Sequence, residues 1–229
     1  MQDILQKTEL MPEILLIDKP LGWSSFDVIR HLRKQLGIKK MGHAGTLDPL
    51  ATGLMIIGVG AGTKKLKDLI GLDKTYEAEI LLGESTTTGD AEGAVTATTI
   101  VKPLDNETIK SAVEGLRGVL NLPVPAYCAI KVGGQRLYKL ARQGKPVTLP
   151  VKTMKVLDIK MRGLRPTADG LCIVSVEMSV SSGTYVRSVA VELGRRLGYP
   201  ARLNALRRTR IGQYSIKDAF TVATSRGQP

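Results

Sequence analysis

Residues Met41–Gly53 read MGHAGTLDPLATG, and the rest of the sequence is most easily interpreted outward from them. The stretch holds three glycines, one of the two histidines of the chain and a single carboxylate, Asp48, followed by Pro49. Glycine permits tight turns and close approach to a ligand, and a residue before proline favours extended backbone. The pattern predicts a turn-rich loop. Asp48 has two possible roles here: capping a turn, or acting as a nucleophile or base presented to an anionic polymer.

The segments on either side of this loop predict strands and helices without strict alternation. Ser24 and Asp27 have the spacing of a capping box, and Gly37 follows at the distance of a helix C-terminus. We expect strands at 13–18, 54–59, 75–82, 94–101, 151–161 and 171–181, one or two more within 201–220, and helices at 24–36, 63–70, 106–116, 136–143 and 184–197. The fold class expected is therefore α+β, with a mixed, largely antiparallel sheet flanked by helices.

Some of these predictions are more detailed. We expect 75–82 to pair with 94–101, and 151–161 to pair antiparallel with 171–181. Asn106 is the expected cap of its helix, and 122–125 is a proline-rich breaker.

The charge of the chain favours a polyanion as partner. Lys and Arg number 33 against 21 Asp and Glu, which gives a formal net charge of +12. Between residues 187 and 210 there are seven arginines and one acid, Glu192. The planar guanidinium suits phosphate, so we interpret this region as a nucleic-acid footprint rather than a solvated basic face.

Other classes of protein are disfavoured. Cys128 and Cys172 are far apart and are expected to be free thiols, and no Cys/His cluster has the spacing of metal ligands. The glycine-rich run 58–65 has Thr63 where a phosphate-binding loop needs glycine. Residues 1–12 lack a signal-peptide pattern and the apolar runs are short, so a cytoplasmic protein without membrane contact is expected. Two-carboxylate glycosidase chemistry stays open, although no aromatic sugar platform is evident.

Three further residues have both a functional and an ordinary interpretation. Arg187 could hold Asp48 ionised or contact a phosphate, or be a plain surface arginine. Tyr76 could stack on an unstacked base, or be a half-buried strand tyrosine. Leu206 could be an apolar wall beside a base, or a core leucine.

Several blocks of sequence, in order and at matching spacing, resemble the TruB family of stand-alone tRNA pseudouridine synthases. They are IDKPLGWSS at 17–25, the loop at 42–53, KTY at 74–76, GDAEG at 89–93, PAY at 125–127 with Lys131 and Leu137-Tyr138, SGTYVR at 182–187, and LRR at 206–208. The resemblance implies isomerisation of uridine 55 in the T-arm of tRNA to pseudouridine, with the target base flipped out. It makes Asp48 the catalytic residue, Tyr76 the residue that stacks on the base, and Arg187 the partner of Asp48.

The same resemblance assigns further binding residues and implies no metal or redox cofactor. Tyr185 and Leu206 would line the uracil pocket, and His43 would fill the space left by the flipped nucleotide or contact the neighbouring RNA. Lys19 and Lys64 would contact phosphates.

The resemblance also implies the domain organisation. We expect one pseudouridine synthase catalytic domain over 1–229, with the excursion at 121–150 as a flap that closes on the T-arm. The C-terminal RNA-binding (PUA-type) domain common in the family is not expected in this chain. A monomer that needs no protein partner is the simplest expectation. Two alternatives remain: a non-catalytic RNA-binding or tRNA-folding protein, and the same chemistry on another RNA.

Overall fold

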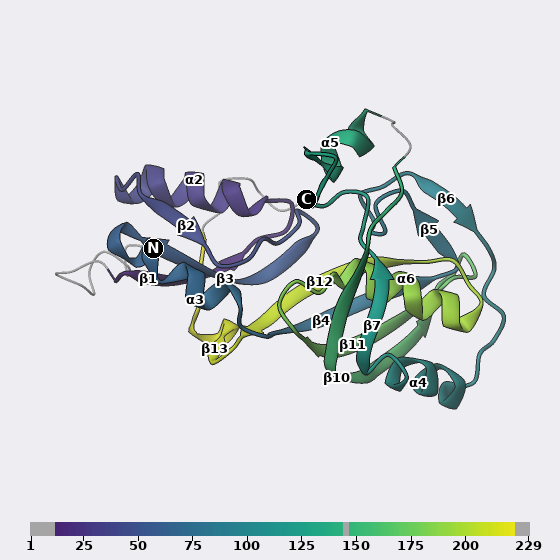
Figure 1. Cartoon of the computed structure of the whole chain (residues 1–229). Helices are drawn as coiled ribbons and strands as arrows, with labels where there is room; N and C mark the ends of the chain where they lie inside the picture. Colours follow the sequence, from purple (N-terminus) through teal and green to yellow (C-terminus); the bar gives the residue numbers. More distant parts are fainter. Residues whose placement is uncertain (1–11, 144–146, 223–229) are drawn as a thin grey trace. The chain divides into compact units, whose positions relative to one another are not determined.

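The computed structural model describes residues 12–143 and 147–222, so part of the predicted flap, 144–146, lies outside the described residues. The described chain divides into two compact units (Figure 1). Unit 1 takes in the described residues up to Tyr76 and from Leu206 onward, and unit 2 spans Glu77–Ala205. Two long strands, β4 (Lys74–Leu82) and β12 (Ala201–Ile211), contribute residues to each unit. The single domain expected over 1–229 stays a prediction.

Unit 1 is built on a mixed sheet. Its strands are β1 (Ile14–Lys19), β2 (Met41–His43), β3 (Ala51–Val59), β13 (Tyr214–Ser215) and β14 (Phe220–Thr221), with parts of β4 and β12. The order is β14-β1-β3-β12-β4, while β2 pairs with β3 and β13 with β12. β1 and β2 are antiparallel to β3, whereas β12 runs parallel to it, with Leu206 opposite Ala51.

Helical segments complete unit 1. They are α2 (Ser25–Leu36), the 3-10 helices η1 (Gly60–Lys64) and η2 (Ile216–Asp218), and α3 (Leu66–Ile70). α2 begins and ends as the sequence predicts, with a complete capping box between Ser24 and Asp27 and a left-handed Gly37 at its end. Its apolar face, with Val28, Ile29 and Leu32, is buried.

Over the described residues, the strands of unit 2 continue the same ten-stranded sheet, in the order β12-β4-β11-β10-β7. The strands not yet introduced are β7 (Gly118–Pro123), β10 (Val151–Pro166) and β11 (Cys172–Val180), and the helices are α4 (Asn106–Glu114), α5 (Leu137–Arg142) and α6 (Val186–Leu197). Two small hairpins are formed by β5 (Glu84–Thr86) with β6 (Val95–Thr98) and by β8 (Lys131–Val132) with β9 (Gln135–Arg136).

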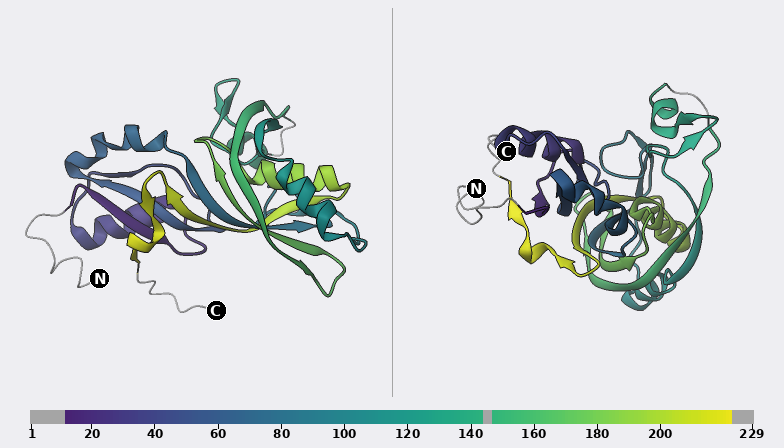
Figure 2. Two further views of the ribbon diagram at one scale, coloured as in Figure 1. Left: turned by 90° about the horizontal axis from the view of Figure 1, so that it is seen from below. Right: turned by 60° about the vertical axis from the view of Figure 1, so that its left-hand side comes forward.

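The antiparallel pair of β10 and β11 is confirmed, and the two strands run side by side in Figure 2. The predicted apolar face of β11 is buried throughout: Cys172, Val174, Val176, Met178 and Val180. Ile109, Val113 and Leu116, predicted to share one side of a helix, are buried as well. Both cysteines are free and buried.

The fold class predicted from the sequence, α+β with a mixed sheet and flanking helices, is confirmed. Four local predictions are corrected. β6 pairs with β5 instead of β4, because β12 and β11 take both edges of β4. Asp105, one residue before Asn106, caps α4. β7 extends through Leu122 to Pro123, where a breaker was expected. The ends of the 41–53 stretch are strands, so the loop itself is shorter.

In the described part of the chain, no helix is both long enough and apolar enough to span a membrane. Among residues 12–143 and 147–222, no group of three or more His, Cys, Asp or Glu side chains is arranged to hold a metal ion.

Candidate active site

The Asp48 loop, residues 44–50, connects two paired strands of unit 1, β2 and β3. Ala44 donates its N–H to the carbonyl of Ile56 at 3.0 Å, and Ala51 donates to the carbonyl of Asp48 at 3.0 Å. The side chains of Ala44 and Leu47 are buried, while Asp48 is half-buried. The loop is therefore anchored inward at two points and leaves the carboxylate at the edge of the core.

Ser25 fixes the residue just before Asp48. Its hydroxyl accepts from the N–H of Leu47 at 2.8 Å and donates to the carbonyl of Leu47 at 3.0 Å. Ser25 is buried in the first turn of α2, so both hydrogen bonds are shielded from solvent. One hydroxyl thus satisfies both backbone groups of Leu47, which have no strand partner.

Lys19 fixes the residue just after Asp48. Its ammonium donates to the carbonyls of Pro20, Trp23 and Pro49, the last at 3.3 Å. Gly22 also donates its N–H to the Pro49 carbonyl, at 2.9 Å. Lys19 is fully buried, so the expected phosphate contact does not fit its position. Its contacts instead tie the 19–23 turn to the Asp48 loop.

Arg208 holds the beginning of the loop and the strand that follows it. Its Nε donates to the carbonyl of Leu54 at 2.7 Å, and one terminal nitrogen donates to the carbonyl of Gly45 at 3.2 Å. Arg208 lies opposite Gly53 in the β12–β3 register. Gly53 has φ 105°, and a Cβ there would lie 2.3 Å from the Arg208 carbonyl oxygen, so a larger residue would separate the strands.

Lys74 is a third buried cation in this unit. Its ammonium donates to the carbonyls of Ile70 and Leu72 at 2.7 and 2.6 Å. Burial, and next the positive charge of Arg208, lower the pKa of Lys74 to about 8. The interior of unit 1 is thus electropositive around Arg208.

Tyr76 and Leu206 lie on adjacent strands of unit 1. β12, which carries Leu206, lies between β3 and β4, and β4 carries Tyr76. Leu206 is opposite Ala51, only three residues after Asp48, and its carbonyl is 3.5 Å from the Thr52 hydroxyl. Tyr76 is largely buried and Leu206 is half-buried. The parallel pairing of β3 with β12 therefore brings Leu206 close to the Asp48 loop.

His43 and Lys64 are placed differently in unit 1. His43 ends β2, and its pKa is lowered, first by burial and next by the charge of Arg208. The imidazole is therefore neutral near pH 7. Its Nδ1 is buried without a hydrogen-bond partner among the residues that the structure describes. Lys64, in η1, is exposed, as a phosphate contact requires.

In unit 2, Arg187 is a buried arginine that joins three segments. Its guanidinium donates to the carbonyls of Thr88 and Tyr127, each at 3.0 Å, and lies 3.5 Å from a carboxylate oxygen of Asp90. The Arg187 side chain is only 7% exposed. Asp48 belongs to unit 1 and Arg187 to unit 2, and the predicted pair of these residues stays a prediction.

Tyr185 immediately precedes α6, the helix that carries Arg187. The ammonium of Lys152 lies 5.5 Å from the centroid of its ring and donates to the carbonyl of Gly183 at 2.8 Å. The half-buried ring of Tyr185 is therefore already in a cation–π contact.

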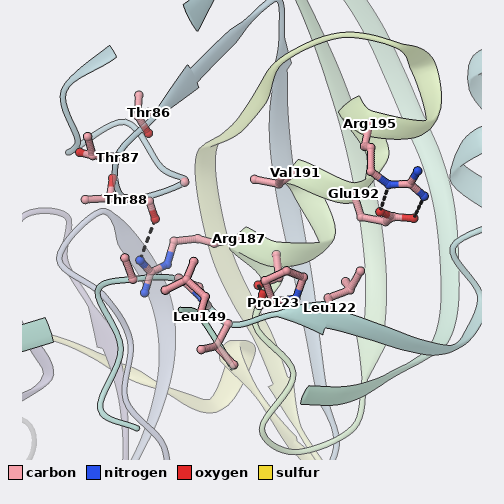
Figure 3. Close-up of a pocket in the computed structure, with 15 residues that line it drawn as sticks. Thr86, Thr87, Thr88, Leu122, Pro123, Leu149, Arg187, Val191, Glu192 and Arg195 are labelled. Carbon is pink, nitrogen blue, oxygen red and sulfur yellow. Dashed lines mark hydrogen bonds and ion pairs between the residues drawn. The ribbon is translucent and has the colours of Figure 1, made fainter. Parts of the chain in front are cut away.

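A pocket of about 280 Å³ lies beside Arg187 (Figure 3). Figure 3 shows Arg187 bonded to Thr88 on one side and the ion pair of Glu192 with Arg195 on the other. Hydrogen bonds from Arg195, and then from Arg196, lower the pKa of Glu192 to about 2. Most of the walls are apolar: Leu122, Pro123, Val124, Pro125, Ala126, Leu149 and Val191.

The family of the chain follows from comparison with known proteins. A family model described as TruB family pseudouridylate synthase (N terminal domain) matches residues 33–186. The chain belongs to the TruB family. A tRNA pseudouridine synthase B of Mycobacterium sp. (strain KMS) is 43% identical over 216 residues, which cover 94% of this chain and 72% of the relative. One of Thermobifida fusca (strain YX) is 42% identical over 212 residues, covering 91% and 72%.

Two solved structures share the fold of this TruB-family enzyme. A crystal structure of a Cbf5-Nop10-Gar1 complex superposes with a TM-score of 0.69 at 24% identity. A structure of an H/ACA RNP bound to a substrate RNA containing 2'-deoxyuridine gives 0.67 at 22% identity. Each match covers 91% of the chain, which spans about half the length of the two solved chains.

The residues that sequence reasoning missed in this TruB-family enzyme are those that hold others in place. Ser25, Lys74, Asp90 and Arg208 each belong to a stretch of sequence that resembles the family, but no role was predicted for them. All four are buried, which is unusual for charged and polar residues. Their place inside the family motifs was the sign that the sequence offered.

Removal of the Ser25 hydroxyl tests whether the Asp48 loop is positioned through Leu47. If Asp48 is the reacting group that the sequence predicts, Ser25→Ala should lower kcat for pseudouridine formation by up to roughly 100-fold with little change in KM, because displacement of such a group by about 1 Å has that effect. Steady-state kinetics measure the split. Ser24→Ala is the matched control, since it weakens the α2 cap without touching Leu47. A normal kcat in Ser25→Ala would contradict the positioning role.

The half-buried imidazole of His43 predicts a pH-dependent stability. Its folded pKa lies below its ordinary value of 6.5, so below pH 6.5 the unfolded chain binds more protons than the folded one. Stability is therefore complete above that pH and falls as the pH drops. Urea unfolding at pH 7.5 and 5.5 should show a smaller loss for His43→Gln than for the wild type.

His31 contributes in the same direction, because burial lowers its pKa too. His31→Gln should therefore retain the His43 part of the loss. Equal losses in the wild type and His43→Gln would exclude His43 as a contributor.

Proposed function

We propose that this enzyme isomerises one uridine of tRNA, uridine 55 in the T-arm, to pseudouridine, and that Asp48 begins the reaction. The observation that carries the proposal is the Asp48 loop itself. It presents a half-buried carboxylate between two backbone positions, Leu47 and Pro49, that are hydrogen-bonded to the buried side chains of Ser25 and Lys19. Relatives named tRNA pseudouridine synthase B support tRNA as the substrate.

The reaction rearranges bonds without any change of composition. The bond from ribose C1' to uracil N1 breaks, the detached uracil turns, and C1' joins C5. N1 gains a proton and C5 gives up its own. In the proposal Asp48 acts as the nucleophile or base that begins this sequence, and no oxidant, reductant or metal takes part in the balance.

The target base must leave the stack before Asp48 can reach it, at a cost of a few kcal/mol. Tyr76 is proposed to stack on the extruded uracil and Leu206 to form an apolar wall beside it. Their placement supports this, since Leu206 lies on β12, which pairs with β3, and Tyr76 lies on β4, the strand on the other side of β12. The first residue of β3 is three positions after Asp48. His43 is proposed to fill the space that the base vacates, which suits a neutral ring, and exposed Lys64 to contact a phosphate.

Unit 2 is proposed to supply the remaining contacts. Arg187 would keep Asp48 ionised and Tyr185 would line the uracil pocket. Arg187 suits the role because three contacts, to Thr88, Tyr127 and Asp90, already hold its guanidinium in one orientation.

The central test is release of tritium from a tRNA transcript labelled at uridine C5. Wild-type protein should release one tritium per tRNA, because the new bond at C5 expels that hydrogen. Asp48→Asn should retain RNA binding and slow release by roughly 10²–10⁴-fold or more. Asp68→Asn, an exposed carboxylate on α3, is the matched control. Bound RNA without release by the wild type would favour an RNA-binding protein or another RNA substrate.

A transcript with cytidine at position 55 tests the site of modification. It should release no tritium if uridine 55 is the target. Continued release from that transcript would place the modified uridine elsewhere in the RNA.

The segment 121–150 is proposed to close over the T-arm when RNA binds. The bond from Arg187 to the Tyr127 carbonyl supports this, because it links the segment to α6. Limited proteolysis should cut the segment more slowly in the presence of tRNA. An unchanged cleavage pattern with and without tRNA would contradict the closure.

A further inference from the structure

The N-terminal half of α2 carries an exposed aromatic ring between two cations. Phe26 is 55% exposed, although phenylalanine side chains are usually buried in the core. The guanidinium carbons of Arg30 and Arg33 are 5.6 and 5.8 Å from its ring centroid. Arg30 and Arg33 follow Phe26 by four and seven residues, so all three lie on one side of the helix. This side is separate from the buried face with Val28, Ile29 and Leu32. Nothing in the core of unit 1 requires this ring.

The charge around Phe26 is strongly positive. Residues 25–40 include five cations, Arg30, Arg33, Lys34, Lys39 and Lys40, against one carboxylate, Asp27. Asp27 is held by the capping box and lies 3.1 Å from the Arg30 guanidinium, so its own charge is compensated. The Arg30 side chain is 69% exposed, and the three lysines are exposed as well. A surface of one charge sign suits the phosphates of a nucleic acid better than a protein partner, whose own surface carries both signs.

The surface continues to the Asp48 loop. Leu21, in the turn before α2, is 66% exposed. Its neighbour Gly22 donates to the carbonyl of Pro49 at 2.9 Å, and Pro49 follows Asp48 directly. Ser25, the neighbour of Phe26, is hydrogen-bonded to Leu47 of the same loop. The backbone at Leu21 and at Phe26 is therefore tied to the loop that carries the carboxylate, within one compact unit (Figure 1).

We propose that this face, the α2 surface formed by Leu21, Phe26, Arg30, Lys34, Lys39 and Lys40, binds the RNA strand that adjoins the target nucleotide. A base stacks on Phe26 and the backbone follows the cations along the helix. Stacking on an exposed aromatic ring combined with flanking cations is how proteins hold single-stranded RNA without strict sequence readout. α2 has 12 residues and so is about 18 Å long, which is room for several nucleotides. The identity of this RNA as tRNA rests on the proposed function, but the α2 surface itself does not.

The test is equilibrium binding of a tRNA transcript to the full chain, measured by filter binding over a range of salt concentrations. Phe26→Ala should bind about tenfold more weakly, as removal of one base–aromatic stack would cause, and Phe26→Tyr should restore binding. The double variant Arg30→Gln, Lys34→Gln should flatten the slope of log K against log salt by roughly 0.7 for each phosphate that the variant no longer neutralises.

Two matched controls lie elsewhere on the surface. Val95→Ala removes an exposed apolar side chain of β6, and Lys110→Gln removes an exposed cation of α4. Both should bind RNA as the wild type does. Wild-type affinity and salt slope in the α2 variants would overturn the inference.

Tritium release separates this inference from the proposed function. If wild-type protein releases no tritium but Phe26→Ala still weakens RNA binding, only the proposed function fails. If wild-type protein releases tritium and every α2 variant binds normally, only the α2 surface fails.

Discussion

The hydrogen bonds from three buried side chains to the backbone of the Asp48 loop are the contacts on which the position of Asp48 depends. Residues 44–50 form no ladder with a neighbouring strand, so their buried carbonyl and N–H groups need other partners. Ser25, Lys19 and Arg208 supply them at Leu47, Pro49 and Gly45. The loop is therefore held on both sides of the carboxylate, and removal of the Ser25 hydroxyl would leave both backbone groups of buried Leu47 unsatisfied.

Two of these three side chains are cations, and burial of a cation is unfavourable unless it is well bonded. Lys19 meets this condition with three carbonyls, and Arg208 with two. Lys74 adds a third buried positive charge, and the pKa values of Lys74 and His43 are lowered first by burial and next by the charge of Arg208. Positive charge of this kind favours an anionic polymer as ligand. The contacts that fix the loop therefore also set the electrostatics of unit 1.

In unit 2, the buried side chain of Arg187 likewise holds backbone carbonyls in place by hydrogen bonds. One buried guanidinium joins α6 to the turn at Thr88 and to Tyr127, and Asp90 balances its charge. A pocket with largely apolar walls lies beside it, and the partners of the guanidinium hold it in one orientation. In both units a buried arginine gives an irregular segment a defined backbone position.

Much of the local structure could be predicted from the sequence because its causes are local. The capping box of Ser24 and Asp27 and the left-handed Gly37 define α2 within 14 residues of chain. The alternation of β11 predicted its buried face. The pairing of β6 could not be predicted in this way, because β4 pairs with β11 and β12, which begin only at Cys172 and Ala201. Proximity in sequence favoured the wrong partner.

The sequence by itself determined the class of fold, the family and the identity of Asp48, Tyr76, Arg187 and Leu206 as candidates, since short motifs at fixed spacing encode them. Only the tertiary structure decided which polar residues are buried and what they hold. Lys19 reads as a phosphate ligand in the sequence and is a fully buried backbone clamp in the fold. The sequence alone does not distinguish an exposed lysine from a buried one. Its role is decided by whether water or a buried carbonyl meets its ammonium, and that depends on strands and loops distant in sequence.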